Sequence, residues 1–168
     1  ALEEARKNYQ IALSVNPRYA EALNNLAAVY HGEHNFKRAE QTYKKALKYA
    51  PTAAITYRNL GTSYFADGKN KQGTRAYEKA LSLNPRVFQS GENQPIEETS
   101  TRSQRIAISY YLAKAYAMAG ENEQALACLR KAMDDGFRDR RHLMEDKEFA
   151  RLRTTPEFQQ LVIDQHLD

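Results

Sequence analysis

Histidine, cysteine and acidic side chains could bind a metal or catalyse a reaction in this protein. Their spacing along the sequence indicates whether enough of them come together to do so. His31 and His34 flank Glu33, an arrangement that suggests a metal site. A zinc site needs three or four ligands, and no cysteine or further histidine accompanies this group in a recognisable spacing. We therefore predict no metal site and interpret both histidines as solvated turn residues.

Catalysis by a nucleophile or by an acid–base pair finds no better support. Cys128 and His142 could act as nucleophile and base, but Cys128 lies beside the apolar stripe of a predicted helix, where a small packed residue is expected. Asp134 and Asp135 precede Gly136, and turn chemistry explains such a pair. The glycine-containing stretches lack the lysine–serine pair of a phosphate loop. The sequence thus predicts a protein that is not an enzyme and binds no cofactor.

Composition and charge exclude further classes. The chain of 168 residues is 42% hydrophobic and 27% charged, and its net charge of +4 comes from basic residues scattered among 21 acids. We expect a soluble protein that binds no nucleic acid. No apolar run approaches the roughly 20 residues of a membrane helix. Residues 1–10 do not resemble a signal peptide, which leaves a cytoplasmic or a periplasmic location open.

The elements that would position any site recur at a fixed interval. Prolines, tyrosines and alanines each repeat every 34 residues, as Pro17, Pro51 and Pro85, as Tyr9, Tyr43 and Tyr77, and as Ala12, Ala46 and Ala80. In the first full unit, apolar residues follow the i, i+3, i+4, i+7 spacing of one helical face, at Leu23, Leu26, Ala27 and Tyr30. Gly32 and Asn35 are turn residues that we expect to end this helix. A second helix follows and stops before Pro51.

The repeat predicts the organisation of the whole chain. We expect the second helix of a truncated repeat at 1–19, full units at 20–53 and 54–87, an inserted loop at 88–105, a degenerate third unit at 106–137 and a helical cap at 138–168. The third unit follows the second by 52 residues, as Leu60 with Leu112 shows, so an 18-residue insertion separates them. We expect this insertion to form a surface loop, with a helix restarting near residues 101–103. Because the chain opens inside a repeat, we expect it to be a piece of a longer protein.

The stretch YRNLGTSY, with Gly68, Gly73, Tyr77, Ala80 and Pro85 after it, resembles the tetratricopeptide repeat. The resemblance covers about four-fifths of the chain and implies an all-α, right-handed superhelical solenoid of antiparallel helix pairs. Departures are concentrated in the third unit, where Leu129 replaces an aromatic residue and Phe137 replaces the closing proline. The tail pattern D-x-x-F-x-x-L-R-x-x-P-x-F-x-x-L is similar to segments that follow many bacterial arrays of this family.

The tail has a physical role beside that resemblance. A solenoid leaves the apolar face of its last repeat open, and a segment with a polar outer side must cover it. We expect short helices to do so with six buried apolar residues, namely Leu143, Phe149, Leu152, Phe158, Leu161 and Val162.

The resemblance also implies a binding surface, because the first helix of each unit lines a concave groove in this family. Projected onto this sequence, the groove includes nine residues that we expect to meet a partner: Asn24, Asn25, His31, Arg58, Asn59, Thr62, Phe65, Tyr110 and Lys114. Flanking positions are Glu21, Ala28, Ile55, Ala107, Tyr111 and Ala117. Asn25 and Asn59 share one repeat position, while Arg58 and Lys114 supply positive charge. Ala28 and Thr62 stand where a chaperone-tail clamp would need Asn or Lys, so we do not predict that activity.

Three functions stay open at this point. The first is a scaffold that binds a protein or peptide, extended or helical and with an acidic character, in a mildly basic groove. The second is self-assembly through the half-repeat at the start, whose apolar side (Leu2, Ala5, Tyr9 and Leu13) lacks its usual covering helix. The third is an accessory domain of a larger enzyme.

Overall fold

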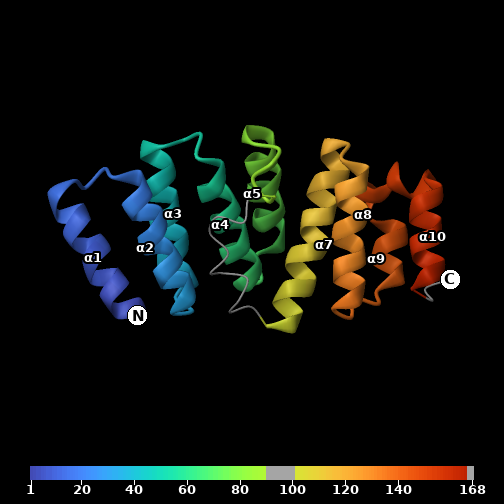
Figure 1. The fold of residues 1–168 in the computed structure, drawn as a ribbon, viewed down its shortest axis with the longest axis horizontal. Helices are drawn as coiled ribbons and strands as arrows, with labels where there is room; N and C mark the ends of the chain where they lie inside the picture. The colour runs from blue at the N-terminus through green and yellow to red at the C-terminus, as the bar shows by residue number, and fades with distance from the viewer. Residues whose placement is uncertain (90–100, 166–168) are drawn as a thin grey trace. The chain divides into compact units, whose positions relative to one another are not determined.

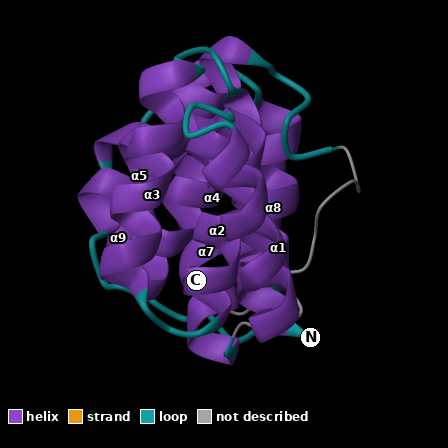
Figure 2. Ribbon diagram, turned by 90° about the vertical axis from the view of Figure 1, so that its left-hand side faces the viewer, coloured by secondary structure: helices purple, strands orange, loops and turns teal. Residues whose placement is uncertain are grey.

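The computed structural model describes residues 1–89 and 101–165, and within them the backbone forms only helices and turns. Figure 2 shows this all-helical composition. The chain divides into two compact units, residues 1–99 and 100–168. Most of the predicted insertion, residues 90–100, lies outside the described residues.

The described residues of unit 1 form five helices, and Figure 1 shows how they follow one another. Their bounds are α1 Leu2–Val15, α2 Ala20–Gly32, α3 Phe36–Tyr49, α4 Ala54–Ala66 and α5 Asn70–Leu83. Helix α2 packs against α3 and α4 against α5, while α3 contacts α4 and α1 contacts α2. This succession of packed pairs confirms the predicted all-α fold.

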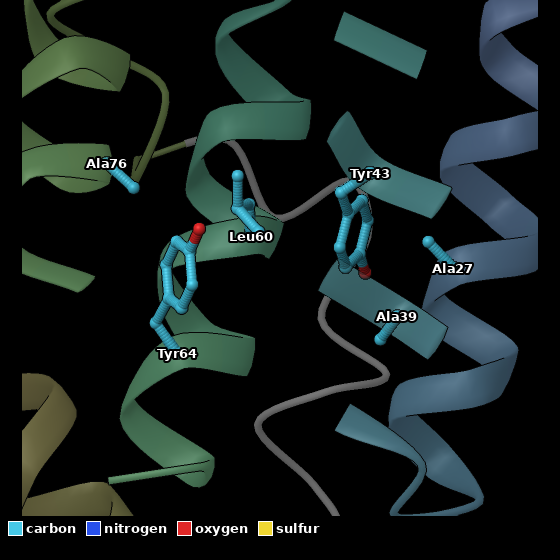
Figure 3. Packing of buried hydrophobic residues seen from close by; sticks show 6 residues of the cluster. All are labelled: Ala27, Ala39, Tyr43, Leu60, Tyr64 and Ala76. Atoms are coloured by element: carbon cyan, nitrogen blue, oxygen red, sulfur yellow. The ribbon is translucent and has the colours of Figure 1, made fainter. Parts of the chain in front are cut away.

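Helix pairs are stacked through small and aromatic residues at the predicted repeat positions. Tyr43 of α3 is fully buried and lies between Ala27 of α2 and Leu60 of α4 (Figure 3). Ala39 and Tyr64 extend the same cluster. An alanine beside each ring lets two helices approach closely, and burial of one large aromatic side chain contributes about 2–3 kcal/mol.

The turns between paired helices share a left-handed backbone conformation at one repeat position. Gly68 and Gly120 take the left-handed conformation, with φ of 73° and 80°. His34 occupies the same repeat position and adopts φ 57°, although it has a β-carbon. Helix α2 ends at Gly32, as expected, although Gly32 is its last helical residue and the turn falls on Glu33 and His34. Asn35 instead caps α3, its side chain accepting a hydrogen bond from the Arg38 amide at 3.2 Å.

Unit 2 pairs two long helices and ends in short ones. Its elements are α7 Arg102–Ala119, α8 Asn122–Asp134, α9 Arg140–Glu145, the 3₁₀ helices η1 Lys147–Phe149 and η2 Leu152–Thr154, and α10 Pro156–Asp164. The helix predicted to restart near residues 101–103 does so, with Thr101 and Gln104 forming a reciprocal capping box. All six apolar residues assigned to the tail are buried.

Candidate functional site

A surface hollow of about 440 Å³ lies where the first turns of α2 and α4 meet the turn between α3 and α4. It is lined by Ala20, Glu21, Asn24, Asn25, Ala50, Ala53, Ile55 and Thr56. All of these residues belong to unit 1. The hollow combines small apolar walls with two amides and one carboxylate, which is the mixture that a polypeptide segment requires.

A chain of amide hydrogen bonds forms one side of the hollow. The Asn59 Nδ2 donates to Asn24 Oδ1 at 3.3 Å, and Asn24 Nδ2 donates to Asn25 Oδ1 at 3.1 Å. Asn24 and Asn59 are buried, whereas Asn25 is half-buried. The Asn25 NH₂ group has no acceptor within the described part of the chain. The two buried amides therefore hold Asn25 through its oxygen and leave its NH₂ group available on a residue that lines the hollow.

The electrostatics of the hollow differ from the basic groove that the sequence suggested. Glu21 is the ionisable side chain among the lining residues, and it is exposed. Its carboxylate accepts a hydrogen bond from the Tyr19 hydroxyl at 3.3 Å. No cation among the described residues pairs with Glu21. Its carboxylate therefore attracts a basic segment and disfavours an acidic one.

Arg58 is committed to a contact inside unit 1. Its side chain is buried, and Nη1 donates to the Val87 carbonyl oxygen at 3.0 Å. Val87 is itself fully buried, so this bond ties α4 to the turn after α5. The guanidinium therefore acts as a brace between elements rather than as an open cationic surface.

Thr62 and Phe65 are also buried between the helices of the second repeat. The Thr62 hydroxyl lies 2.8 Å from the Tyr77 hydroxyl, and the Phe65 ring meets the Tyr77 ring edge-on at 4.9 Å. Both residues thus join α4 to α5. They support the face that carries Ile55 and do not line the hollow.

His31 is a buried helical residue, so the prediction of a solvated turn is wrong for it. Its side chain is 7% exposed, and Nδ1 lies 2.7 Å from the Ser63 hydroxyl of α4. Burial, together with the nearby charge of His34, lowers the pKa of His31 to about 4. The imidazole is therefore neutral near pH 7 and serves as a hydrogen-bonding partner between α2 and α4. His34 is exposed, as expected.

Tyr110 and Lys114 form a buried polar cluster with the tail of unit 2. The Tyr110 hydroxyl donates a short hydrogen bond to Asp146, and Lys114 Nζ lies 2.9 Å from Asp146 and 3.3 Å from Glu148. Burial alone would raise the pKa of Asp146, but the bonds from Tyr110 and Lys114 outweigh it and lower that pKa. The cation predicted for the groove is therefore matched by two carboxylates of its own chain.

Residues at one repeat position of the projected groove form hydrogen bonds with other parts of the chain. Asn24, Arg58 and Tyr110 are equivalent in the repeat, and each bonds a later element of the chain. Asn24 meets α4, Arg58 meets the turn after α5, and Tyr110 meets the start of η1. A side chain at this position joins successive elements of the chain. A single sequence does not show whether such a side chain contacts a neighbouring element or a ligand.

Sequence reasoning left Asp146 and Arg153 without a role. Arg153 Nη1 donates to the carbonyl oxygens of Leu143 and Asp146, at 3.2 Å and 2.7 Å. Phe149 packs edge-on against Tyr110 at 5.7 Å. The tail pattern D-x-x-F-x-x-L-R is thus the sequence signal of a clamp that fastens the tail to α7.

Other chemistry finds no assembled site in the described residues. No group of three or more potential metal ligands occurs among residues 1–89 and 101–165. Cys128 lies half-buried on α8. No helix in these ranges is long and apolar enough to cross a membrane.

Family models match the first half of the chain. A model described as TPR repeat matches residues 1–32, and models described as tetratricopeptide repeat match residues 20–53 and 54–87. The chain belongs to the tetratricopeptide repeat family. Repeats of this family generally mediate protein–protein interactions and serve as non-enzymatic scaffolds.

Solved structures are similar to this tetratricopeptide repeat chain at low sequence identity. Pseudomonas aeruginosa pilF aligns over 96% of this chain and 64% of its own, with 20% identity and a TM-score of 0.53. The crystal structure of MamA covers 80% of this chain and 88% of its own, with 22% identity and a TM-score of 0.48. The likeness to pilF supports the fold alone. No curated protein sequence matches the chain.

Proposed function

We propose that this tetratricopeptide repeat protein is a scaffold that holds an extended segment of a partner protein in the hollow between α2 and α4. The observation that carries the proposal is the amide chain from Asn59 through Asn24 to Asn25, which ends on a lining residue of the hollow whose NH₂ group has no acceptor among the described residues. A carboxamide held in this way can bond the backbone of a bound segment, whatever its side chains.

The chemistry of the lining defines the segment further. Ile55 is 39% exposed and, with Ala50 and Ala53, offers an apolar wall for one side chain. Glu21 lies beside it and favours a neutral or basic residue. The acidic partner expected from the sequence depended on Arg58 and Lys114, and both are engaged in internal bonds. The proposed segment therefore carries a small apolar residue and no net negative charge.

Peptide-display selection on the full chain tests this function. Selected peptides should bind the native protein and lose about tenfold or more in affinity to an Asn25→Ala, Ile55→Ser double variant. Both side chains are at least partly exposed, and a circular dichroism melt checks that the variant keeps its fold after the Asn24 amide loses its acceptor.

A Lys48→Ala, Lys45→Ala variant on the exposed side of α3 is the matched control and should bind as the native protein does. Peptides that bind both variants with native affinity would contradict the proposal. A selection that enriches mainly acidic peptides would contradict the part assigned to Glu21.

Self-association is a second proposed function, supported by helix α1. None of its residues is buried, and Ile11 and Val15 are 63% and 83% exposed. Light scattering over a concentration series should show a mass that rises with concentration and returns to the monomer value in an Ile11→Lys, Val15→Lys variant. A constant monomeric mass for the native chain would remove this function.

A further inference from the structure

Unit 2 carries a second hollow, of about 390 Å³, between α9 and α10. Phe158 and Val162 form its buried floor, with 1% and 6% of their surfaces exposed. Met144 and Ile163 stand at its mouth and are 38% and 54% exposed. A cluster of apolar side chains open to water at one spot is unusual for a segment that otherwise presents polar residues.

The sequence of the tail explains why apolar surface remains there. Helix α10 buries Phe158, Leu161 and Val162 on the face that packs toward the unit. Ile163 comes next in the chain and projects off that face, where covering the end of a solenoid does not require it. Met144 comes from α9, a helix of only six residues. Ile163 and Met144 thus add apolar surface beyond what capping uses.

Two guanidinium groups border this apolar hollow. Arg140 is exposed at the start of α9, and Arg153 is half-buried with Nη1 on the carbonyl oxygens of Leu143 and Asp146. Neither side chain has a carboxylate partner among the residues that the structure describes. An apolar floor beside two unneutralised cations is complementary to a ligand that joins an apolar body to a carboxylate.

We propose that the α9–α10 hollow is a docking site for a partner protein segment that carries a leucine or phenylalanine beside an aspartate or glutamate. The apolar side chain fills the space over Phe158 and Val162, and the carboxylate bonds Arg140. Gln159 is exposed at the rim and offers an amide to the backbone of the segment. Methionine at the mouth adapts to either apolar side chain.

The open mouth favours a protein segment over a free fatty acid. An acyl chain gains most from an enclosed tunnel that removes all of its surface from water. Here both Met144 and Ile163 are exposed, so the hollow covers one side chain and not a long chain. The site is separate from the Asn25 hollow and takes a ligand of the opposite charge.

The test uses the full chain and a pool of fluorescein-labelled peptides of about 14 residues, with Phe or Leu one helical turn apart and each beside Asp or Glu. Fluorescence anisotropy should show saturable binding of this pool. Pools with lysine in place of the acids, or serine in place of the apolar residues, should bind at least about tenfold more weakly.

Variants locate the binding on the surface. Ile163→Ser and Arg140→Glu should each weaken the acidic pool about tenfold, and Arg140→Glu should bind the lysine pool more strongly than the native chain does. Arg130→Glu, at an exposed position of α8, is the matched control and should change affinity less than about twofold. The Asn25→Ala, Ile55→Ser variant should bind the acidic pool normally, which separates this site from the proposed function.

Several results would overturn the docking site. They are no binding of the acidic pool, equal binding of the lysine pool by the native chain, or native affinity in both hollow variants. Saturable binding of dodecanoate that is lost in Ile163→Ser, without binding of any peptide pool, would assign the hollow to a fatty acid and reject the proposal.

Discussion

At the scale of single residues, one hydroxyl pair shows how a repeat position can be satisfied in one unit and not in another. Tyr77 shares a hydrogen bond with Thr62. In the preceding repeat Ala28 stands at the position of Thr62, and the buried hydroxyl of Tyr43 has no partner among the described residues. Burial raises the pKa of Tyr43 well above its usual value. The unpaired hydroxyl costs stability, because its bonds to water are not replaced.

Removing each hydroxyl should therefore have opposite effects. We expect Tyr77→Phe to lower the free energy of unfolding by about 1 kcal/mol and Tyr43→Phe to leave it unchanged or raise it by up to about 1 kcal/mol. Urea denaturation followed by circular dichroism measures both. Equal losses in the two variants would show that Tyr43 has a partner after all.

His31 should make stability depend on pH. Its pKa is about 4 in the folded chain against an ordinary value of 6.5, so the unfolded chain binds more protons between these values. The contribution of His31 to the free energy of unfolding is fully present above about pH 6.5. It falls as the pH drops toward 4, by up to about 3 kcal/mol.

The measurement is the urea midpoint of the native chain and of His31→Gln at pH 7 and pH 4.5. The variant should lose less stability than the native chain over this interval, since it has no imidazole to protonate. Parallel losses would show that other groups control the acid sensitivity and that His31 is accessible to protons while folded.

At the scale of helices, two glycines set how closely α4 and α5 approach. A β-carbon on Gly61 would lie 2.5 Å from Tyr77 Cδ1, and one on Gly73 would lie 2.4 Å from the Phe65 ring. The rings fill the space that the missing side chains leave. A larger residue must displace a buried aromatic ring that is packed on all sides.

Gly61→Ala should consequently destabilise unit 1 by about 1–3 kcal/mol, and Gly61→Leu by more, despite the higher helix propensity of both residues. Gly32→Ala is the control, because a β-carbon there meets only Leu2 at 3.5 Å, an ordinary contact distance. That change should be neutral or stabilising by up to about 1 kcal/mol. Thermal melts in which Gly61→Ala equals the native chain would contradict the packing.

The stability of the tail of unit 2 should depend on the polar cluster that Asp146 forms with Tyr110 and Lys114. Asp146→Asn removes the anion that accepts from Tyr110 and Lys114, so the tail should lose about 1–3 kcal/mol of local stability. Amide hydrogen exchange of Phe149 and Leu161 would then quicken. Glu145→Gln, which breaks an exposed pair with Arg141, should change exchange little. Equal protection in both variants would mean that apolar packing alone holds the tail.

At the scale of the whole molecule, the periodic residues predict the fold well but do not by themselves decide which side chains meet a partner. Tyr43, Tyr77 and the alanines beside them recur because each repeat must bury the same face, so their burial is expected from spacing alone. Several of the predicted partner-binding residues bond the next element, as Asn24, Arg58 and Tyr110 do. Whether such a side chain contacts a partner or a neighbour depends on the side chains of the next element, as the bond between Tyr110 and Asp146 shows.

Some features of the structure cannot be predicted from the sequence of a single repeat. His34 in a left-handed turn depends on backbone geometry that its neighbours impose, and His31 is buried because Ser63 of the next repeat offers a partner at 2.7 Å. Ile163 follows Leu161 and Val162 in an apolar run. Which of these side chains is exposed depends on the bounds and packing of α10, which the sequence does not give. Each of these depends on contacts between elements that lie apart in sequence.

The location of a bound peptide tests the central claim most directly. Nitrogen-15 NMR spectra of the full chain, titrated with a display-selected peptide, report which amides change environment. We predict that the largest shifts occur at Glu21, Asn25 and Ile55, around the hollow between α2 and α4. Shifts confined to α3 and α5, or saturable binding that leaves all three amides unmoved, would contradict a scaffold that binds its partner there.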